Sequence, residues 1–262
     1  MRVLILPTAA DSGPVVADLV QAAVQAAVRA ALAGPGRAVL GLATGSSPLP
    51  AYRELIRRHR EEGLSFAGVE AFLLDEYVGL PPGHPQAYRE VIRREFTAHV
   101  DVDPAAVHGP DGTHPDPDRA AAQYERALLA GGPVAVQVLG IGANGHVGFN
   151  EPGSALDSTT RVTTLTERTR RDNARFFGSP AAVPRRVITQ GLATIGRAEH
   201  LVLVAAGPAK AAAVAAALEG PVSASCPASV LQRHPRVTVV LDEAAAAGLA
   251  PADHHRYATS TD

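Results

Sequence analysis

The chain alternates between segments with helical periodicity and short apolar runs that are typical of buried strands. In the helical segments apolar residues recur every three to four positions, and the first segment is predicted to stop at Gly34. Helices are predicted at 15–34, 49–63, 86–100, 118–132 and 208–220, followed by a last short helix after 242. Strands are predicted at 38–42, 70–77, 134–140, 200–206 and 236–242.

This alternation predicts βαβ units and therefore a mostly parallel sheet with helices on both faces. The expected fold is an α/β, single-domain, Rossmann-like three-layer sandwich over residues 1–262, because no linker, internal repeat or low-complexity tail interrupts the pattern. In such folds ligands bind beyond the carboxyl ends of the strands. The residues that directly follow each apolar run are therefore the candidates for chemistry.

Composition narrows the class of protein. Hydrophobic residues make up 46% and charged residues 19% of 262 residues, and the net charge is −2, which favours neither nucleic acid nor an acidic membrane surface as a partner. A single cysteine, Cys226, rules out an internal disulfide and predicts a reducing, cytoplasmic location. The N-terminal apolar run stops at Pro7, too early for a signal peptide, and no run approaches the ~20 residues of a membrane span. The histidines lack metal-ligand spacing, so no metal site is predicted.

The stretch "ATGSSP" follows the strand-like run "AVLGL". Gly45 allows a tight turn, Pro48 suits the first turn of a helix, and Ser47 is the expected N-cap. Backbone N–H groups and the hydroxyls of Thr44 and Ser46 then form an anion site at a helix N-terminus. Without the Gly-Lys-Ser/Thr of a nucleotide P-loop, a small phosphate ester fits better than ATP. An ordinary capped turn between a strand and a helix explains the pattern equally well.

Two acids, Asp75 and Glu76, follow the run "AFLL". Neighbouring side chains of a strand point to opposite sides, so at most one of the two faces a site. Asp75 is the better candidate for a base, because it comes first after the buried run and partial desolvation would tune its pKa. A solvated loop acid is the simpler alternative from this segment alone.

The stretch "GIGANGHVGFNEPG" contains the GxGxxG pattern of a dinucleotide-binding turn. That turn requires a helix to start at its third glycine, and Gly148, Pro152 and Gly153 oppose one here. The motif instead predicts a glycine-rich loop with His146 and Glu151 five residues apart. A carboxylate can orient an imidazole and hold its proton in place, which indicates acid–base chemistry rather than nicotinamide binding.

Taken together, these segments resemble the glucosamine-6-phosphate deaminase (glucosamine-6-phosphate isomerase) family. The resemblance extends over about residues 38–215 and rests on "LGLATGSSPLPAYREL", "FLLDEYVGL" with "HPQAY", "GIGANGHVGFNEPGS", "TRVTTLTERTRRDNARFF" and "GPAKAAA". The related 6-phosphogluconolactonases share the fold and the glycine-rich loop. They usually carry Arg where this chain has Tyr77, and they lack the run "FNEP", so the lactonase is the second hypothesis.

The resemblance implies a catalytic role for each candidate near the sugar. Asp75 would move a proton between C2 and C1 of the open-chain sugar. His146 would open the pyranose ring with help from Glu151, and Asn144 would lie nearby. The product imine would be hydrolysed to fructose 6-phosphate and ammonia, a hydrolase reaction of amino-sugar catabolism that requires no cofactor.

The resemblance also implies how the phosphate is held. It assigns the phosphate to the turn at Gly45, Ser46 and Ser47, to Arg175 and to Lys210, the only lysine of the chain. Residues of about 158–187 resemble the family's mobile lid, and Arg175 would bring that lid onto the phosphate.

Departures from the family concern regulation and sugar preference. Ala87 stands where the family commonly has Ser before the Tyr of "HPxSY". Ser154 and Arg161 match allosteric positions of members that bind N-acetylglucosamine 6-phosphate, but Thr163 replaces the Lys of that site. Activation by that ligand, and the hexamer that accompanies it, are therefore not expected, while a homo-oligomer stays open. A galactosamine 6-phosphate deaminase and a non-catalytic sugar-phosphate sensor are further alternatives.

Overall fold

A computed structural model describes residues 1–31, 37–250 and 255–256. Its main sheet has eight strands in the order β11-β1-β10-β9-β6-β2-β3-β5, and every neighbouring pair runs parallel. The strands are β1 (Arg2–Leu6), β2 (Ala38–Leu42), β3 (Val69–Leu73), β5 (Val107–His108), β6 (Val136–Leu139), β9 (Leu201–Ala205), β10 (Val237–Asp242) and β11 (His255–Arg256). The predicted parallel sheet is confirmed, with β1, β5 and β11 in addition to the strands expected from the sequence.

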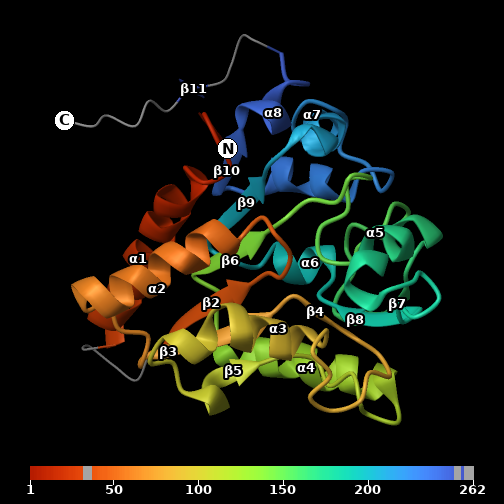
Figure 1. The fold of residues 1–262 in the computed structure, drawn as a ribbon, viewed down its shortest axis with the longest axis horizontal. Helices are drawn as coiled ribbons and strands as arrows, with labels where there is room; N and C mark the ends of the chain where they lie inside the picture. The colour runs from red at the N-terminus through yellow and green to blue at the C-terminus, as the bar shows by residue number, and fades with distance from the viewer. Residues whose placement is uncertain (32–36, 251–254, 257–262) are drawn as a thin grey trace.

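Helices cover both faces of this sheet, as predicted (Figure 1). Alternate residues of β2 show the two layers: Leu40 packs into the large core that α1 and α2 share, whereas Val39 packs against Tyr124 and Leu128 of α4 on the other face. The helices are α1 (Ser12–Ala31), α2 (Leu49–Glu62), α3 (Tyr88–Glu95), α4 (Pro117–Gly131), α5 (Glu167–Phe177), α6 (Leu192–Ile195), α7 (Ala211–Leu218) and α8 (Glu243–Ala246). The single-domain, three-layer α/β fold is therefore confirmed.

Helix boundaries depart from the sequence-based prediction in informative places. The predicted stop of the first helix at Gly34 lies outside the described residues. Helix α3 is shorter than expected, because Phe96 leaves the helical conformation and a 3₁₀ turn follows. The prediction that Ser47 caps α2 is wrong: the helix begins at Leu49, and Pro48, which has no side-chain donor or acceptor, occupies the cap position. Ser47 is thereby left one residue before the cap.

A second sheet, which the sequence analysis did not predict, lies beside the first. It contains three antiparallel strands in the order β4-β8-β7, with β4 (Asp75–Tyr77), β7 (Arg161–Thr164) and β8 (Arg186–Thr189). The predicted strand 70–77 is thus wrong as one element, because the chain changes sheets at Leu74, whose N–H bonds Leu42 O at 3.2 Å. Figure 1 shows β7, β8 and α5 together as a lobe at the right of the main sheet.

The start of the predicted lid is held firmly to the body of the protein. Ser158 O accepts a hydrogen bond from Ala193 N at 2.9 Å, and Ser158 Oγ accepts one from Leu192 N at 3.2 Å. Thr160 donates from both its backbone and its hydroxyl to Glu125 of α4. These bonds tie Ser158 and Thr160 to α6 and α4, while a mobile lid over about 158–187 stays a prediction.

Gly191 provides a test of this anchoring. A Cβ at this position would overlap the backbone carbonyls of Ser158 and Thr159, which cannot move away without breaking the anchor. We expect Gly191→Ala to lower the free energy of unfolding by about 1–3 kcal/mol, measured by urea denaturation. Gly109→Ala is the matched control, because its Cβ would meet only the Leu73 side chain at an ordinary 3.5 Å. Equal stability of the two variants would contradict the predicted overlap.

Candidate active site

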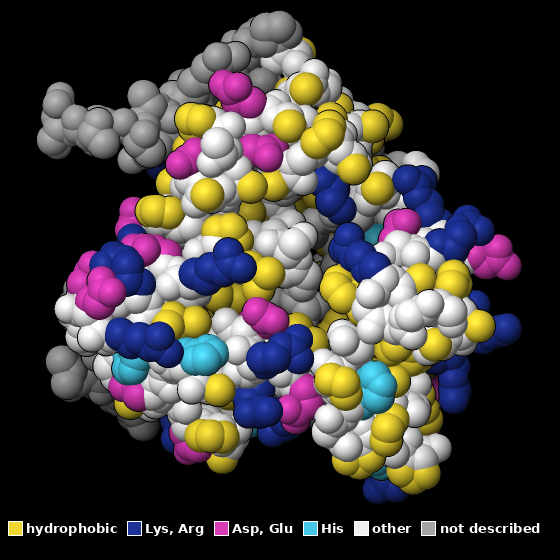
Figure 2. Space-filling model, in the orientation of Figure 1, with side chains coloured by type: hydrophobic (Ala, Val, Ile, Leu, Met, Phe, Trp, Pro, Cys, Tyr) yellow, Lys and Arg dark blue, Asp and Glu magenta, His cyan; other side chains and the backbone are white. Residues whose placement is uncertain are grey.

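A pocket of about 380 Å³ opens at the carboxyl ends of the parallel strands. Its wall is built from the loops after β2 and β6, from β4, from the first turns of α3, from α5 and from Lys210. Figure 2 shows this face hollowed near its centre, with basic side chains on the rim. Most of the predicted site residues line the pocket, namely Thr44, Gly45, Ser46, Ser47, Asp75, His146, Arg175 and Lys210.

Of the two adjacent acids of β4, Asp75 is the one that faces this pocket. The residue is 6% exposed and lines the pocket, whereas Glu76, also 6% exposed, lies on the opposite side of β4 and lines a different cavity. Strand alternation therefore separates the two carboxylates as predicted. Burial raises the pKa of Asp75 well above its usual value, and the neighbouring charge of Glu76 raises it further.

His146 lies on the glycine-rich loop with Glu151 and Asn144 behind it. Asn144 donates to Glu151 Oε2 at 2.7 Å, and its own Oδ1 accepts the backbone N–H of His146 at 3.3 Å. His146 Nδ1 lies 3.7 Å from the same Glu151 oxygen and is buried without a hydrogen-bond partner in the described part of the chain. A shortening of about 0.7 Å would bring the pair into hydrogen-bond range.

The carboxylate of Glu151 is held in its ionised form. Burial alone would raise its pKa, but His146 and hydrogen bonds from Thr169 and Asn144 outweigh burial and lower the pKa to about 2. Thr166 donates to the other carboxylate oxygen at 3.2 Å. Asp75 and Glu151 are thus two buried acids with opposite pKa shifts, and such a pair is well suited to divide base and orienting roles.

Two glycines make this loop possible. The imidazole of His146 lies directly over Gly142, where any Cβ would overlap ring atoms. Gly148 has a φ of +56° and brings the backbone close to Asp75: a Cβ there would lie 3.5 Å from Asp75 Oδ2 and 3.0 Å from Thr189 Oγ1. The glycines therefore serve close approach, and no helix follows the GxGxxG pattern, which agrees with the argument against nicotinamide binding.

The turn after β2 forms the opposite wall of the pocket. Gly45 adopts a φ of +92°, a conformation that favours glycine. Tyr52 of α2 fixes the start of this turn, because its hydroxyl donates to Ala43 O at 2.7 Å and accepts Ala43 N–H at 3.1 Å. Thr44, Ser46 and Ser47 face the pocket even though Ser47 does not cap the helix. The anion-binding turn is thus compatible with the structure, with a changed role for Ser47.

Arg175 and Lys210 add positive charge to the pocket. Arg175 is an exposed residue in the last turn of α5, and its guanidinium lies 4.7 Å from the centre of the Phe176 ring. Burial lowers the pKa of Lys210, Asp172 opposes that shift, and Arg175 adds to it. Two cations from distant parts of the chain therefore share one pocket, as expected of an anion site.

Ser154 and Arg161 contact each other but do not line this pocket. Arg161 donates to Ser154 Oγ at 3.0 Å and to Asn150 Oδ1 at 2.9 Å, and burial lowers its pKa. Thr163 lies two residues further along the same strand, β7. The two proposed allosteric residues thus form one cluster at the base of the lid, and their binding of an effector stays a prediction.

Several residues of the pocket were not assigned a role from the sequence. Tyr88, at the start of α3, stacks on Phe149 with ring centres 5.8 Å apart and donates its hydroxyl to Tyr77 at 3.3 Å. Thr169 and Asn173 reach the pocket from α5, and Asn173 donates to the Tyr77 hydroxyl at 2.9 Å. The quoted segments "HPQAY" and "TERTRRDNARFF" contain these residues, but only the structure shows that Tyr88 and Asn173 both bond the Tyr77 hydroxyl.

Residues 1–31, 37–250 and 255–256 contain no group of three or more His, Cys, Asp or Glu placed to hold a metal ion. Within the same ranges, no helix is long and apolar enough to cross a membrane.

The fold and the pocket together define an α/β protein that brings Asp75, His146 and the turn at Gly45 to the carboxyl edge of a parallel sheet. Comparison with known proteins gives the family. The chain belongs to the family described as glucosamine-6-phosphate isomerases/6-phosphogluconolactonase, which matches residues 11–240.

Relatives lie on the deaminase side of this family. Glucosamine-6-phosphate deaminases of Rhodococcus opacus (strain B4) and Arthrobacter sp. (strain FB24) are 57% and 56% identical, each over 98% of this chain and 96% of the relative. A solved monomeric glucosamine-6-phosphate deaminase is 40% identical, with a TM-score of 0.85 over 95% of this chain and 100% of that one. A 6-phosphogluconolactonase from Trypanosoma cruzi, 19% identical with a TM-score of 0.71 over 95% of this chain and 97% of that one, shares the fold.

The opposite pKa shifts of Asp75 and Glu151 predict opposite effects on stability. Because the pKa of Asp75 is raised in the folded protein, the wild type loses stability as pH rises above the unfolded value of about 4. Asp75→Asn removes this cost, so its Tm should exceed the wild-type Tm at pH 7 and approach it near pH 4. Each kcal/mol corresponds to about 2–4 °C.

Glu151→Gln should change the Tm in the opposite direction when both variants are measured by calorimetry over the same range of pH. The pKa of Glu151 is lowered to about 2, so its stabilisation is complete above the unfolded pKa of about 4.3 and is lost as pH falls toward 2. The variant should therefore melt below the wild type at pH 7. An Asp75→Asn protein that melts below the wild type at every pH would contradict the assigned burial cost.

Proposed function

We propose that the protein converts glucosamine 6-phosphate and water into fructose 6-phosphate and ammonia. The observation that carries the proposal is the single pocket that holds a buried carboxylate of raised pKa, Asp75, together with His146, an anion-binding turn and Lys210. Full-length relatives at 54–57% identity bear the name of this activity. The final C–N cleavage by water makes the proposed reaction a hydrolysis within amino-sugar catabolism.

Ring opening is the first proposed step. The imidazole of His146 accepts the proton of the C1 hydroxyl and donates a proton to the ring oxygen, so that the bond between C1 and the ring oxygen breaks and the C1 aldehyde is released. Glu151 keeps the imidazole oriented, because Asn144 and Thr166 fix its carboxylate and the charge lies 3.7 Å from Nδ1. The carboxylate remains ionised at neutral pH, since its pKa is about 2.

Proton transfer from C2 to C1 is the second proposed step. The ionised form of Asp75 removes the C2 proton, the electron pair forms a double bond between C2 and C1, and the C1 carbonyl oxygen takes up a proton from water to give an enolamine. The protonated carboxyl returns the proton to C1 while the nitrogen lone pair forms the C2–N double bond, and loss of one N–H proton to water leaves a C2 imine. A raised pKa makes the carboxylate a stronger base, which favours removal of the C2 proton.

Imine hydrolysis completes the reaction. Water adds to C2, and the C–N bond breaks with release of ammonia, which leaves the C2 ketone of fructose 6-phosphate. The phosphate meanwhile binds the turn at Gly45, with Lys210 and Arg175 as cationic partners. Contacts this far from C1 and C2 contribute positional binding energy to every step.

Closure of the lid would bring Arg175 and Phe176 of α5 over the substrate. Both residues are exposed and line the pocket, so a movement of α5 would exclude water from Asp75 and His146. We place the reaction in the cytoplasm, where sugar phosphates and a free cysteine are both expected.

The lactonase is the weaker candidate because of Tyr77 and Asn150. Tyr77 is 2% exposed within an aromatic cluster and offers the substrate no cation. Asn150 is fully buried and donates to Val147 O at 2.9 Å and Gln190 O at 2.8 Å, so the "FNEP" run holds the catalytic loop in place.

The first experiment measures ammonia and fructose 6-phosphate together after addition of glucosamine 6-phosphate. We expect equimolar release, with Asp75→Asn slower by about a thousandfold or more because the base is absent. Galactosamine 6-phosphate and a 6-phosphogluconolactone serve as parallel substrates. Faster turnover of galactosamine 6-phosphate would reassign the sugar, and lactone hydrolysis without ammonia release would overturn the proposal.

Lys210 is expected to act on substrate binding more than on chemistry. Lys210→Met keeps the aliphatic length and removes the charge, so KM should rise about ten- to a hundredfold, matching the ~1.5–3 kcal/mol of a charge-assisted hydrogen bond. The change in kcat should be smaller. Inhibition by inorganic phosphate should weaken in parallel in Lys210→Met. The KM of Lys210→Arg should lie between those of the wild type and Lys210→Met. An unchanged KM for Lys210→Met would remove Lys210 from the phosphate site.

A further inference from the structure

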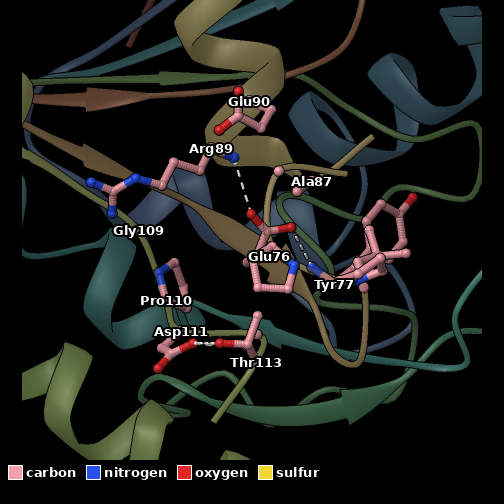
Figure 3. A pocket seen from close by; sticks show the side chains of 14 residues that line it. Glu76, Tyr77, Ala87, Arg89, Glu90, Gly109, Pro110, Asp111 and Thr113 are labelled. Atoms are coloured by element: carbon pink, nitrogen blue, oxygen red, sulfur yellow. Dashed lines mark hydrogen bonds between the residues drawn. The ribbon is translucent and has the colours of Figure 1, made fainter. Parts of the chain in front are cut away.

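Glu76 is a buried carboxylate that the proposed mechanism does not use. It lies on the side of β4 opposite Asp75 and lines a separate pocket of about 260 Å³. Figure 3 shows Glu76 among the residues that line this pocket, next to Tyr77 and Arg89. Its carboxylate accepts three backbone hydrogen bonds, from Tyr77 N at 2.8 Å, Tyr88 N at 2.9 Å and Arg89 N at 3.0 Å. Three N–H donors stabilise the ionised form of such a buried acid.

Two of these donors are the first N–H groups of α3. The residue at the N-cap of this helix is Ala87, whose methyl group cannot accept a hydrogen bond, and no side-chain cap is present there. Glu76 of β4 therefore caps α3, although it lies twelve residues before Tyr88 in the chain. Ala87, which departs from the Ser common in the resembled family, is tolerated because the cap comes from another element.

The capped residue Tyr88 reaches into the candidate active site. Its ring lines the pocket beside Asp75 and Thr44, stacks on Phe149 and lies 4.9 Å from the ring of Tyr77. Burial raises the pKa of the Tyr88 phenol well above its usual value, with further contributions from Tyr77 and Asp75. The backbone at Tyr88 has to be held in place for the ring to keep this position.

Glu76 also acts on Asp75 through its charge. The two residues are adjacent in β4, and the charge of Glu76 is the second cause, after burial, of the raised pKa of Asp75. Burial raises the pKa of Glu76 above its usual value, and the N–H bonds from Tyr77, Tyr88 and Arg89 oppose that shift because they favour the ionised form.

We propose that Glu76 is a positioning residue of the active site: it caps α3 to hold Tyr88 against the pocket and places a negative charge behind Asp75. This inference rests on the proposed function for its kinetic consequence. Its structural content, a charge next to Asp75 and a cap on α3, is independent of which sugar phosphate is bound.

Two variants separate the cap from the charge. Glu76→Gln keeps one oxygen acceptor and removes the charge, so the pKa of Asp75 should fall. Glu76→Asp keeps the charge but is one methylene shorter, so it should release α3 and Tyr88 while leaving Asp75 nearer its wild-type titration. Glu90→Gln is the control, because Glu90 lines the same cavity as Glu76 but pairs with exposed Arg93.

The decisive readout is the titration of Asp75 in protein labelled with ¹³C at the aspartate carboxyl, with the signal assigned by its loss in Asp75→Asn. We expect the titration to move to lower pH in Glu76→Gln and to stay unchanged in Glu90→Gln. This measurement needs no substrate, so it stands even where the proposed function fails. An Asp75 titration that is identical in wild type and Glu76→Gln overturns the inference.

Kinetics on glucosamine 6-phosphate give the second readout. The acidic limb of the pH profile of kcat/KM should move to lower pH in Glu76→Gln, a change that loss of stability alone does not produce. In Glu76→Asp the limb should hold while kcat/KM falls about ten- to a hundredfold, as expected when a pocket residue is displaced. Where Glu76→Gln does not fold, full kcat/KM in Glu76→Asp overturns the capping role.

Discussion

Burial of the Asp75 carboxylate where the two sheets meet is the constraint on which the rest of the site depends. A charged group in this environment costs free energy, so the surrounding structure has to hold it there. Leu74 still bonds to the parallel sheet through Leu42 O, and the next residue, Asp75, pairs with Thr189 of β8 in the second sheet. Around this point the glycine-rich loop, α3 and α5 converge, and each depends on the position of β4.

The sequence was informative wherever chemistry follows a strongly apolar strand. The runs before Thr44, Asp75 and Gly140 are almost entirely buried, and such apolar runs are typical of a parallel sheet with residues of the next loop at its carboxyl edge. The parallel sheet, the two helical layers and the meeting of Asp75 with His146 could therefore be predicted. The resemblance to a family added Arg175 and Lys210, which no local pattern marks as partners.

The second sheet escaped prediction for a physical reason. Strands β7, "RVTT", and β8, "RVIT", are four residues long, begin with arginine and are separated by a whole helix, so neither the length nor the alternation of apolar residues identifies them. Helix caps could not be predicted for a similar reason: Ser47 lies one residue before the cap position of α2, and α3 is capped by Glu76 of β4. The second sheet and the cap of α3 both depend on interactions between distant segments, which local sequence propensity does not reveal.

The pairing of Asp75 with Thr189 has a consequence for synthesis on the ribosome. The two residues are far apart in the chain, and β8 must be complete before β4 has a partner. A nascent chain that ends before β8 would present Asp75 to water, where a carboxylate keeps its ordinary, weak basicity. The raised pKa of Asp75 therefore requires a chain that has been synthesised at least through β8.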